Sequence, residues 1–139
     1  MQIQSYLCFN GRCDEAIEHY RQALGAEVEF LMRYDEAPEP CPADMIPANW
    51  GNKVLHTTLR IGETPVMMSD GNSTEPAQFA GISLTALVKD ETQADRVFTA
   101  LGEGGSVCMP LAKTFFSPRF GMVNDKFGVS WMVIVPQEM

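Results

Sequence analysis

The sequence contains the same three-residue phrase twice, 77 positions apart: Ala-Leu-Gly occurs at residues 23–25 and again at residues 100–102. Each copy closes a segment with helical periodicity that follows one predicted strand and precedes another. Two copies in 139 residues favour an internally duplicated single domain over an open repeat array, since such arrays generally need at least three repeats. We therefore expect the functional site where inward-facing residues of both copies converge. A chance match of three residues is the alternative, and the surrounding elements have to decide between the two.

The composition fits one globular domain with an acidic surface. The chain is 45% hydrophobic and 20% charged, with a formal net charge of -8 and a pI near 4.6. Phosphate binding needs clustered Lys and Arg side chains, but the ten in this sequence are scattered, which argues against a nucleic-acid partner. No apolar run approaches the roughly 20 residues that span a bilayer, and the start MQIQSYLCFNGR lacks the regions of a signal peptide. We expect a cytoplasmic protein with neither a membrane nor a nucleic acid as partner.

The four cysteines, at positions 8, 13, 41 and 108, show neither CxxC spacing nor the density of a disulfide scaffold. We therefore expect reduced thiols that bind no metal. Cys13 lies near a predicted helix start, where the helix dipole could lower the pKa of its thiol. A small buried filler residue is the alternative for this position.

Hydrophobic periodicity predicts the same order of elements in both halves: a strand, a helix and three further strands. In the first half these cover residues 2–9, 13–24, 27–33, 54–61 and 65–69. In the second half they cover residues 82–88, 91–101, 106–109, 115–123 and 129–135. Gly25 is expected to end the first helix, and Asp90 with Gln93 forms a capping pattern at the start of the second.

A long loop is predicted at residues 35–52, where prolines at positions 38, 40, 42 and 47 disfavour regular structure. The loop also carries Met45, Ile46 and Trp50, whose apolar side chains favour packing against another surface. Loops of this length inside compact domains are often lids or partner-binding segments. Disorder is the alternative interpretation.

Three stretches carry a family resemblance: Phe9-x-Gly11 followed by EAIEHYRQALGAEV, then KVLHTTLRIGETPVMMSD, and finally DKFGVSWMV. In this order they resemble the vicinal oxygen chelate superfamily of glyoxalases, bleomycin-resistance proteins and extradiol dioxygenases, and its PhnB-like branch in particular. The resemblance implies an α+β fold in which two tandem βαβββ units form a curved open cup with the helices outside. It implies a single glyoxalase-like domain over residues 1–139, with units at 1–75 and 78–139, and a homodimer.

The PhnB-like branch is sometimes labelled as a demethylubiquinone methyltransferase. A classical methyl-donor site would need a glycine-rich strand-to-helix loop in a doubly wound sheet, and this sequence has none. The sequence therefore does not support a methyltransferase activity.

Metal-using members of the superfamily bind one divalent ion through His and Glu side chains on the first and last strands of each unit. Matching the strands places Ser5, Met68, Ser83 and Met132 at these positions, with Ser69 as a neighbouring alternative to Met68. Hydroxyls and thioethers are poor ligands for Fe, Ni, Zn or Mn, so the resemblance implies a site without metal or other cofactor. A register error of one residue would turn every side chain to the other face.

His56 is the candidate catalytic imidazole, because His19 falls on the polar face of the first helix. A nearby Asp70 could make it a general base, and a structural histidine is the alternative. Trp131 and Met132 alternate faces, as do the paired methionines near residue 68, which predicts a soft apolar cup suited to a partly aromatic molecule. Core packing is the alternative for each of them. Arg119 could bind an anionic group of a ligand, and a solvated surface arginine is the alternative.

Three functions remain open from the sequence. The first is a metal-free protein that binds a small organic molecule in the cup, as bleomycin-resistance proteins do. The second is a lyase or isomerase that uses His56 as a base, or a metal bound through shifted ligands such as His56 with Asp70 or Glu63. The third is a dimeric scaffold whose loop apolar residues bury against a second chain. The sequence favours the first and does not name a ligand.

Overall fold

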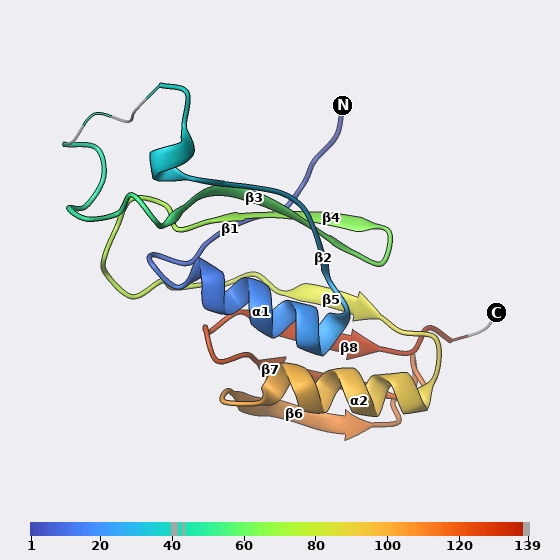
Figure 1. Cartoon of the computed structure of the whole chain (residues 1–139). Coiled ribbons are helices and arrows are strands. Elements are labelled where there is room, and N and C mark those ends of the chain that lie inside the picture. Colours follow the sequence, from blue (N-terminus) through green and yellow to red (C-terminus); the bar gives the residue numbers. More distant parts are fainter. Residues whose placement is uncertain (40–41, 43, 138–139) are drawn as a thin grey trace. The chain divides into compact units, whose positions relative to one another are not determined.

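The computed structural model describes residues 1–39, 42 and 44–137, and the chain divides into two compact units, Met1–Ala77 and Gln78–Met139 (Figure 1). Within the described residues each unit contains one α-helix and one four-stranded sheet, so the predicted α+β class is confirmed. The predicted cup depends on how the two units are placed relative to one another and stays a prediction. Pro40 of the predicted loop and Cys41, one of the expected reduced thiols, lie outside the described residues. No helix in the described part of the chain has the length and apolar character needed to cross a bilayer.

The first unit consists of β1 (Tyr6–Cys8), α1 (Cys13–Leu24), β2 (Glu27–Arg33), the 3-10 helix η1 (Tyr34–Glu36), β3 (Val54–Ile61) and β4 (Thr64–Ser69). The strand order across its sheet is β1-β4-β3-β2, with β1 parallel to β4 and the other pairs antiparallel. Gly25 ends α1 as predicted, in a left-handed conformation with φ 68° that a residue without Cβ adopts at little cost. β1 is shorter than the predicted strand 2–9.

The second unit consists of β5 (Leu84–Leu87), α2 (Glu91–Gly102), β6 (Ser106–Ala112), β7 (Phe120–Asn124) and β8 (Ser130–Ile134). Its strand order is β5-β8-β7-β6, again with the first strand parallel to the last. The two sheets therefore have the same connectivity strand for strand, which confirms the duplication inferred from the repeated phrase.

The predicted strand 115–123 is wrong over its first residues, since β7 begins at Phe120. The cause is a hydroxyl-stabilised turn. The Thr114 hydroxyl accepts hydrogen bonds from the amides of Phe116 and Ser117 at 3.3 and 3.0 Å, and the Thr114 amide donates to the Ser117 carbonyl at 2.9 Å. These local bonds satisfy backbone groups that a strand would otherwise pair with its neighbour.

The predicted capping pattern at α2 is confirmed. The Asp90 carboxylate accepts a hydrogen bond from the Gln93 amide at 2.8 Å, and the Gln93 side chain accepts one from the Lys89 amide at 2.8 Å. Two backbone amides near the helix start are thus satisfied by side chains close in sequence.

Each sheet carries its helix on one face. The apolar stripe of α2 is buried and comprises Ala94, Val97, Phe98 and Leu101. It packs against alternate residues of β7, because a Cβ added at Gly121 would lie 2.8 Å from the Phe98 ring and one added at Gly102 would lie 2.9 Å from Val123. Successive strand residues point to opposite faces, so each sheet has a helix-covered face and a helix-free face.

The start and end of the predicted 35–52 loop are attached to their own unit. Trp50 is buried, its ring lies 6.2 Å from that of Tyr34, and it packs beside Gly11 of the same unit. Met45 is 59% exposed and Ile46 is half-buried. Trp50 therefore has a partner within the unit, whereas a lid or partner-binding role for Met45 and Ile46 stays a prediction.

Candidate functional site

The helix-free face of the first sheet is formed by alternate residues of its four strands. The strand register places Tyr6 beside Met67, Met67 beside Thr58, and Thr58 beside Phe30. The next row along the strands contains Cys8, Ser69, His56 and Met32. This face combines aromatic rings, thioethers and hydroxyls around a single imidazole.

His56 lies at the centre of this face, between two hydroxyl groups. Its Nδ1 is 3.3 Å from the Tyr6 hydroxyl oxygen and its Nε2 is 3.4 Å from the Thr58 hydroxyl oxygen. The imidazole stacks on the Tyr6 ring with centroids 5.6 Å apart and 26° between the planes, and the Phe30 ring is tilted at 6.0 Å. Tyr6 and Phe30 are 45% and 47% exposed, so a flat molecule can reach their rings.

Asp70 does not orient His56, because its carboxylate is used elsewhere. One oxygen accepts hydrogen bonds from the amides of Gly11 and Cys13 at 2.9 and 2.8 Å, and the other accepts one from the Val54 amide at 2.7 Å. Asp70 is fully buried and joins the start of α1 to the start of β3. The predicted pairing of His56 with Asp70 is not formed, and the described partners of His56 are hydroxyls.

Ser5 and Met68, the two ligand-binding residues predicted in the first unit, have different surroundings. Met68 is fully buried and pairs with Leu7 and Thr57, both buried, so it lies on the helix-covered face. The half-buried Met67 occupies the helix-free face instead. Ser5 is half-buried just before β1, and its carbonyl accepts a hydrogen bond from the Met67 amide at 3.2 Å. Ligand binding by Ser5 and Met68 remains a prediction, although Met68 has no exposed surface for it.

The second unit places its proposed residues on both faces. Ser83 and Ser130 join their hydroxyls at 2.8 Å, and Met132, half-buried, lies in the helix-free row next to Thr85 and Met122. Trp131 points the other way and is 4% exposed. Ser83 and Met132 are thus accessible to a small molecule, whereas Trp131 belongs to the core.

Trp131 and the Asp125-Lys126-Phe127-Gly128 stretch serve the architecture of the β7–β8 turn. The buried Asp125 accepts hydrogen bonds from the amides of Phe127 and Val129 at 2.9 and 3.0 Å and from the indole of Trp131 at 3.0 Å. These bonds stabilise the turn, so the stretch has a structural role in the fold.

Arg119 is occupied by an ion pair. Its guanidinium donates from Nε and Nη2 to the Asp95 carboxylate of α2 at 2.8 and 2.6 Å. An anionic ligand would have to compete with Asp95 for these donors. The structure therefore gives a partner on the helix to a side chain that the sequence left available for a ligand.

The described residues contain no group of three or more His, Cys, Asp or Glu side chains arranged to hold a metal ion. The side chains that the resemblance assigns to ligand positions are hydroxyls and thioethers, which do not fit a divalent transition metal. Cys13 is also unsuited to ligation or nucleophilic chemistry. Burial, reinforced by the negative charge of Asp70, raises the pKa of its thiol far above the ordinary value, so the thiolate is suppressed.

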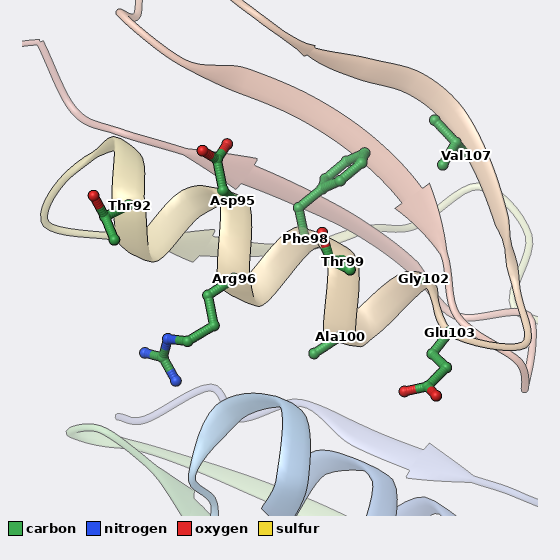
Figure 2. A pocket seen from close by; sticks show the side chains of 9 residues that line it. All are labelled: Thr92, Asp95, Arg96, Phe98, Thr99, Ala100, Gly102, Glu103 and Val107. Atoms are coloured by element: carbon green, nitrogen blue, oxygen red, sulfur yellow. The ribbon is translucent and has the colours of Figure 1, made fainter.

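A shallow groove lies on the opposite side of the second unit from Met122 and Met132. It has a volume of about 940 Å³ and runs along α2 to Val107 of β6 (Figure 2). Phe98 points from the helix toward the strands, whereas Arg96 points away from them (Figure 2). The groove holds no imidazole or thiol among its lining residues, and its Asp95 is already paired with Arg119. The helix-free sheet faces offer more specific chemistry than this groove.

The fold and these faces can be compared with known proteins. The model of the family described as 3-demethylubiquinone-9 3-methyltransferase matches residues 1–134. The chain belongs to this family. Protein YjdN of Escherichia coli is 32% identical over 99% of this chain and 97% of its own length. The structures of PA1353 from Pseudomonas aeruginosa and of a putative 3-demethylubiquinone-9 3-methyltransferase, PhnB protein, from Bacillus cereus are also similar. The Pseudomonas structure is 41% identical, covers 99% of this chain and 99% of its own, and has a TM-score of 0.85. The Bacillus structure is 30% identical, covers 97% of this chain and 99% of its own, and has a TM-score of 0.79.

A glyoxylase/bleomycin resistance protein/dioxygenase domain from Frankia has a TM-score of 0.67 at 12% identity, over 99% of this chain and 98% of that one. This likeness concerns the fold alone. It confirms that this chain has the fold of that glyoxalase-like domain, which is the fold that the sequence motifs indicated.

Sequence reasoning missed most residues of the helix-free faces. Among those it did not single out as site residues are Tyr6, Phe30, Thr58, Met109, Met122 and Ser130. The signal that could have found them is the two-residue period of each strand, anchored on a side chain known to be buried.

Proposed function

We propose that the protein binds a small, largely apolar organic molecule on the helix-free face of its sheets without a metal ion. The observation that carries the proposal is the placement of methionine and aromatic side chains on these faces, where they keep exposed surface. Tyr6 and Phe30 in the first unit and Met109 in the second are each more than 40% exposed. Thioethers adapt to irregular shapes and aromatic rings offer flat stacking surfaces, which suits a small-molecule site.

Acid-base catalysis by His56 has less support. A general base is usually oriented by a partner that stabilises its protonated form, and the partners of His56 are the neutral hydroxyls of Tyr6 and Thr58. These hydroxyls suit a ligand-contacting imidazole as well as they suit a catalytic one. The family's description names a methyltransferase, but this sequence has no glycine-rich loop of the kind that binds a methyl donor.

The adjacent methionines 67 and 68 provide an internal control for a binding experiment. Met67 lies on the helix-free face, and Met68, its neighbour in the chain, is fully buried on the other face. We would titrate protein carrying methyl-labelled methionine with β-naphthol and follow each methyl resonance by NMR. Saturable shifts of Met67 or Met132 that leave Met68 unchanged are expected, with and without a chelator.

Two results would contradict the proposal. If no methyl resonance moved at millimolar probe, or if Met68 moved together with all others, specific binding at the helix-free faces would be wrong. If the shifts appeared only when Zn or Mn was added, the metal-free part of the proposal would be wrong. His56→Ala should weaken binding at the first face, and the same change at exposed Thr99 on α2 should not.

A further inference from the structure

The helix-free face of the second sheet is ordered into three rows of different polarity. Strand register aligns the first two rows across all four strands, and the third row lies at the end of the sheet. The first row contains Leu87, Ile134, Phe120 and Ala112. The second contains Thr85, Met132, Met122 and Met109. The third contains Ser83, Ser130, Asn124 and Ser106. Polarity therefore rises along the strands, from a hydrocarbon row through a row of three thioethers and one hydroxyl to a row of hydroxyls and an amide.

The apolar end of this face extends into the turn before β7. The Phe116 ring meets the Phe120 ring edge-on at 5.0 Å, and the Phe115 ring meets Phe116 in the same way at 5.1 Å. Leu87 is 70% exposed and Phe115 is 94% exposed. Hydrocarbon surface of this extent has a favourable free energy of transfer to an apolar partner.

The polar end offers hydrogen bonds without charge. The Ser83 and Ser130 hydroxyls bond each other at 2.8 Å, so each retains capacity to accept or donate a further bond. The Asn124 side chain lies beside Ser130 in the register. Together they match a hydroxyl group, which both donates and accepts hydrogen bonds, or a carbonyl group, which accepts them.

No position in the three rows is Asp, Glu, Lys or Arg. Arg119, next to the first row in sequence, donates to Asp95 on the helix instead. A charged group brought onto this face would lose hydration without gaining a charged partner. The face therefore discriminates against both anions and cations.

We infer that the second unit binds an elongated, uncharged amphiphile, with its hydrocarbon end on the Leu87, Ile134 and Phe120 row and its hydroxyl or carbonyl end on the Ser83 and Ser130 pair. Ser130 and Ile134 lie four residues apart on β8, so the two ends of the molecule are about 13 Å apart. The inference rests on the proposed small-molecule function and adds the chemical class and orientation of the ligand. A second copy of this chain is the less fitting occupant, because a self-association surface has no need of an ordered polarity gradient.

Three probes with a shared hydrocarbon part test the class: phenylhexanol, phenylhexanoate and phenylhexylammonium at neutral pH. We expect phenylhexanol to bind the protein at least about fivefold more tightly than either ion, the difference of roughly one hydrogen-bonding group. In the complex, intermolecular NOEs should join the phenyl protons to the Ile134 and Leu87 methyl groups.

Matched variants test the orientation. Ser130→Ala should weaken phenylhexanol about fivefold while leaving hexylbenzene, which lacks the hydroxyl, unchanged. Thr99→Ala removes a hydroxyl from exposed α2 and should change neither probe. Because Ser130 lies on the surface-facing row, circular dichroism of the variant should match that of the parent.

The possible results separate the two proposals. Two results would overturn the inferred ligand class while binding of β-naphthol leaves the proposed function standing. The first is that the protein binds all three phenylhexyl probes with equal affinity. The second is that Ser130→Ala leaves the affinity for phenylhexanol unchanged. Absence of binding by every probe would overturn both. Methyl shifts of Met122 and Met132 that depend on protein concentration alone would identify the face as a self-association surface and would likewise overturn the inference.

Discussion

The two units share one connectivity but fasten their helices in different ways. In the first unit the N-cap residue of α1, Arg12, makes no side-chain cap, and the free amides at the helix start are satisfied by Asp70 from the far end of the unit. In the second unit α2 is capped by Asp90, immediately before it. Both helices need acceptors for their first amides; α1 receives one from a residue distant in sequence, and α2 receives one from its neighbour. Duplication has therefore retained the topology without retaining the contacts that stabilise it.

Their helix-free faces differ as well. The first presents an imidazole among aromatic rings, and the second presents uncharged rows that run from hydrocarbon to hydroxyl. Under the proposed function, these unequal faces on equal scaffolds would favour chemical groups of different kinds.

The largest expected effect on stability comes from Asp70→Ala. Three amide hydrogen bonds in a fully buried site would be lost, leaving their donors unsatisfied, so we expect the free energy of unfolding to fall by about 3–5 kcal/mol. Urea unfolding measures this, and hydrogen exchange should show the loss concentrated at the start of α1. If Asp70→Ala lowered the free energy of unfolding no more than Asp90→Ala does, the long-range contact would not be the main stabilising contact of its helix.

A smaller loss is expected from Asp125→Ala in the second unit. Asp125 also accepts three buried hydrogen bonds, but its partners lie within six residues of it, so the β7–β8 turn can open to water without separating distant elements. We expect about 2–3 kcal/mol by urea unfolding, together with a change in Trp131 fluorescence. If the loss exceeded that for Asp70→Ala, the ranking of long-range over local anchors would be reversed.

The smallest effect is expected from Asp90→Ala. Removal of an exposed N-cap carboxylate typically costs about 1 kcal/mol, since water can replace part of the lost bond. Asp90→Asn should recover most of the stability because it keeps an acceptor oxygen. Equal losses for the two variants would mean that charge near the helix start, rather than the capping bond, supplies the stabilisation.

Local patterns predicted the local features of this chain. The bounds of α1, its end at Gly25 and the Asp90 cap each depend on residues within one helical turn, and all are confirmed. Sequence order and the family resemblance were sufficient for the duplicated α+β architecture.

Features that depend on distant contacts escaped prediction. Nothing near Asp70 in the sequence indicates that its carboxylate meets Gly11 and Cys13, so it was paired with His56 instead. The same limit applies to the adjacent methionines 67 and 68: an apolar pair shows that one faces the core, but only strand register shows that it is Met68.

The pairing of β1 with β4 also has a consequence for synthesis of the chain. The first strand finds its neighbour only when residues 67–69 have been made, and α1 receives its carboxylate one residue later. At roughly 5–20 residues per second, the ribosome takes about 3–12 seconds to cover that distance, far longer than a helix needs to form. During this interval the nascent amino-terminal segment has an unpaired strand edge, and its protection from aggregation depends on the rate of translation.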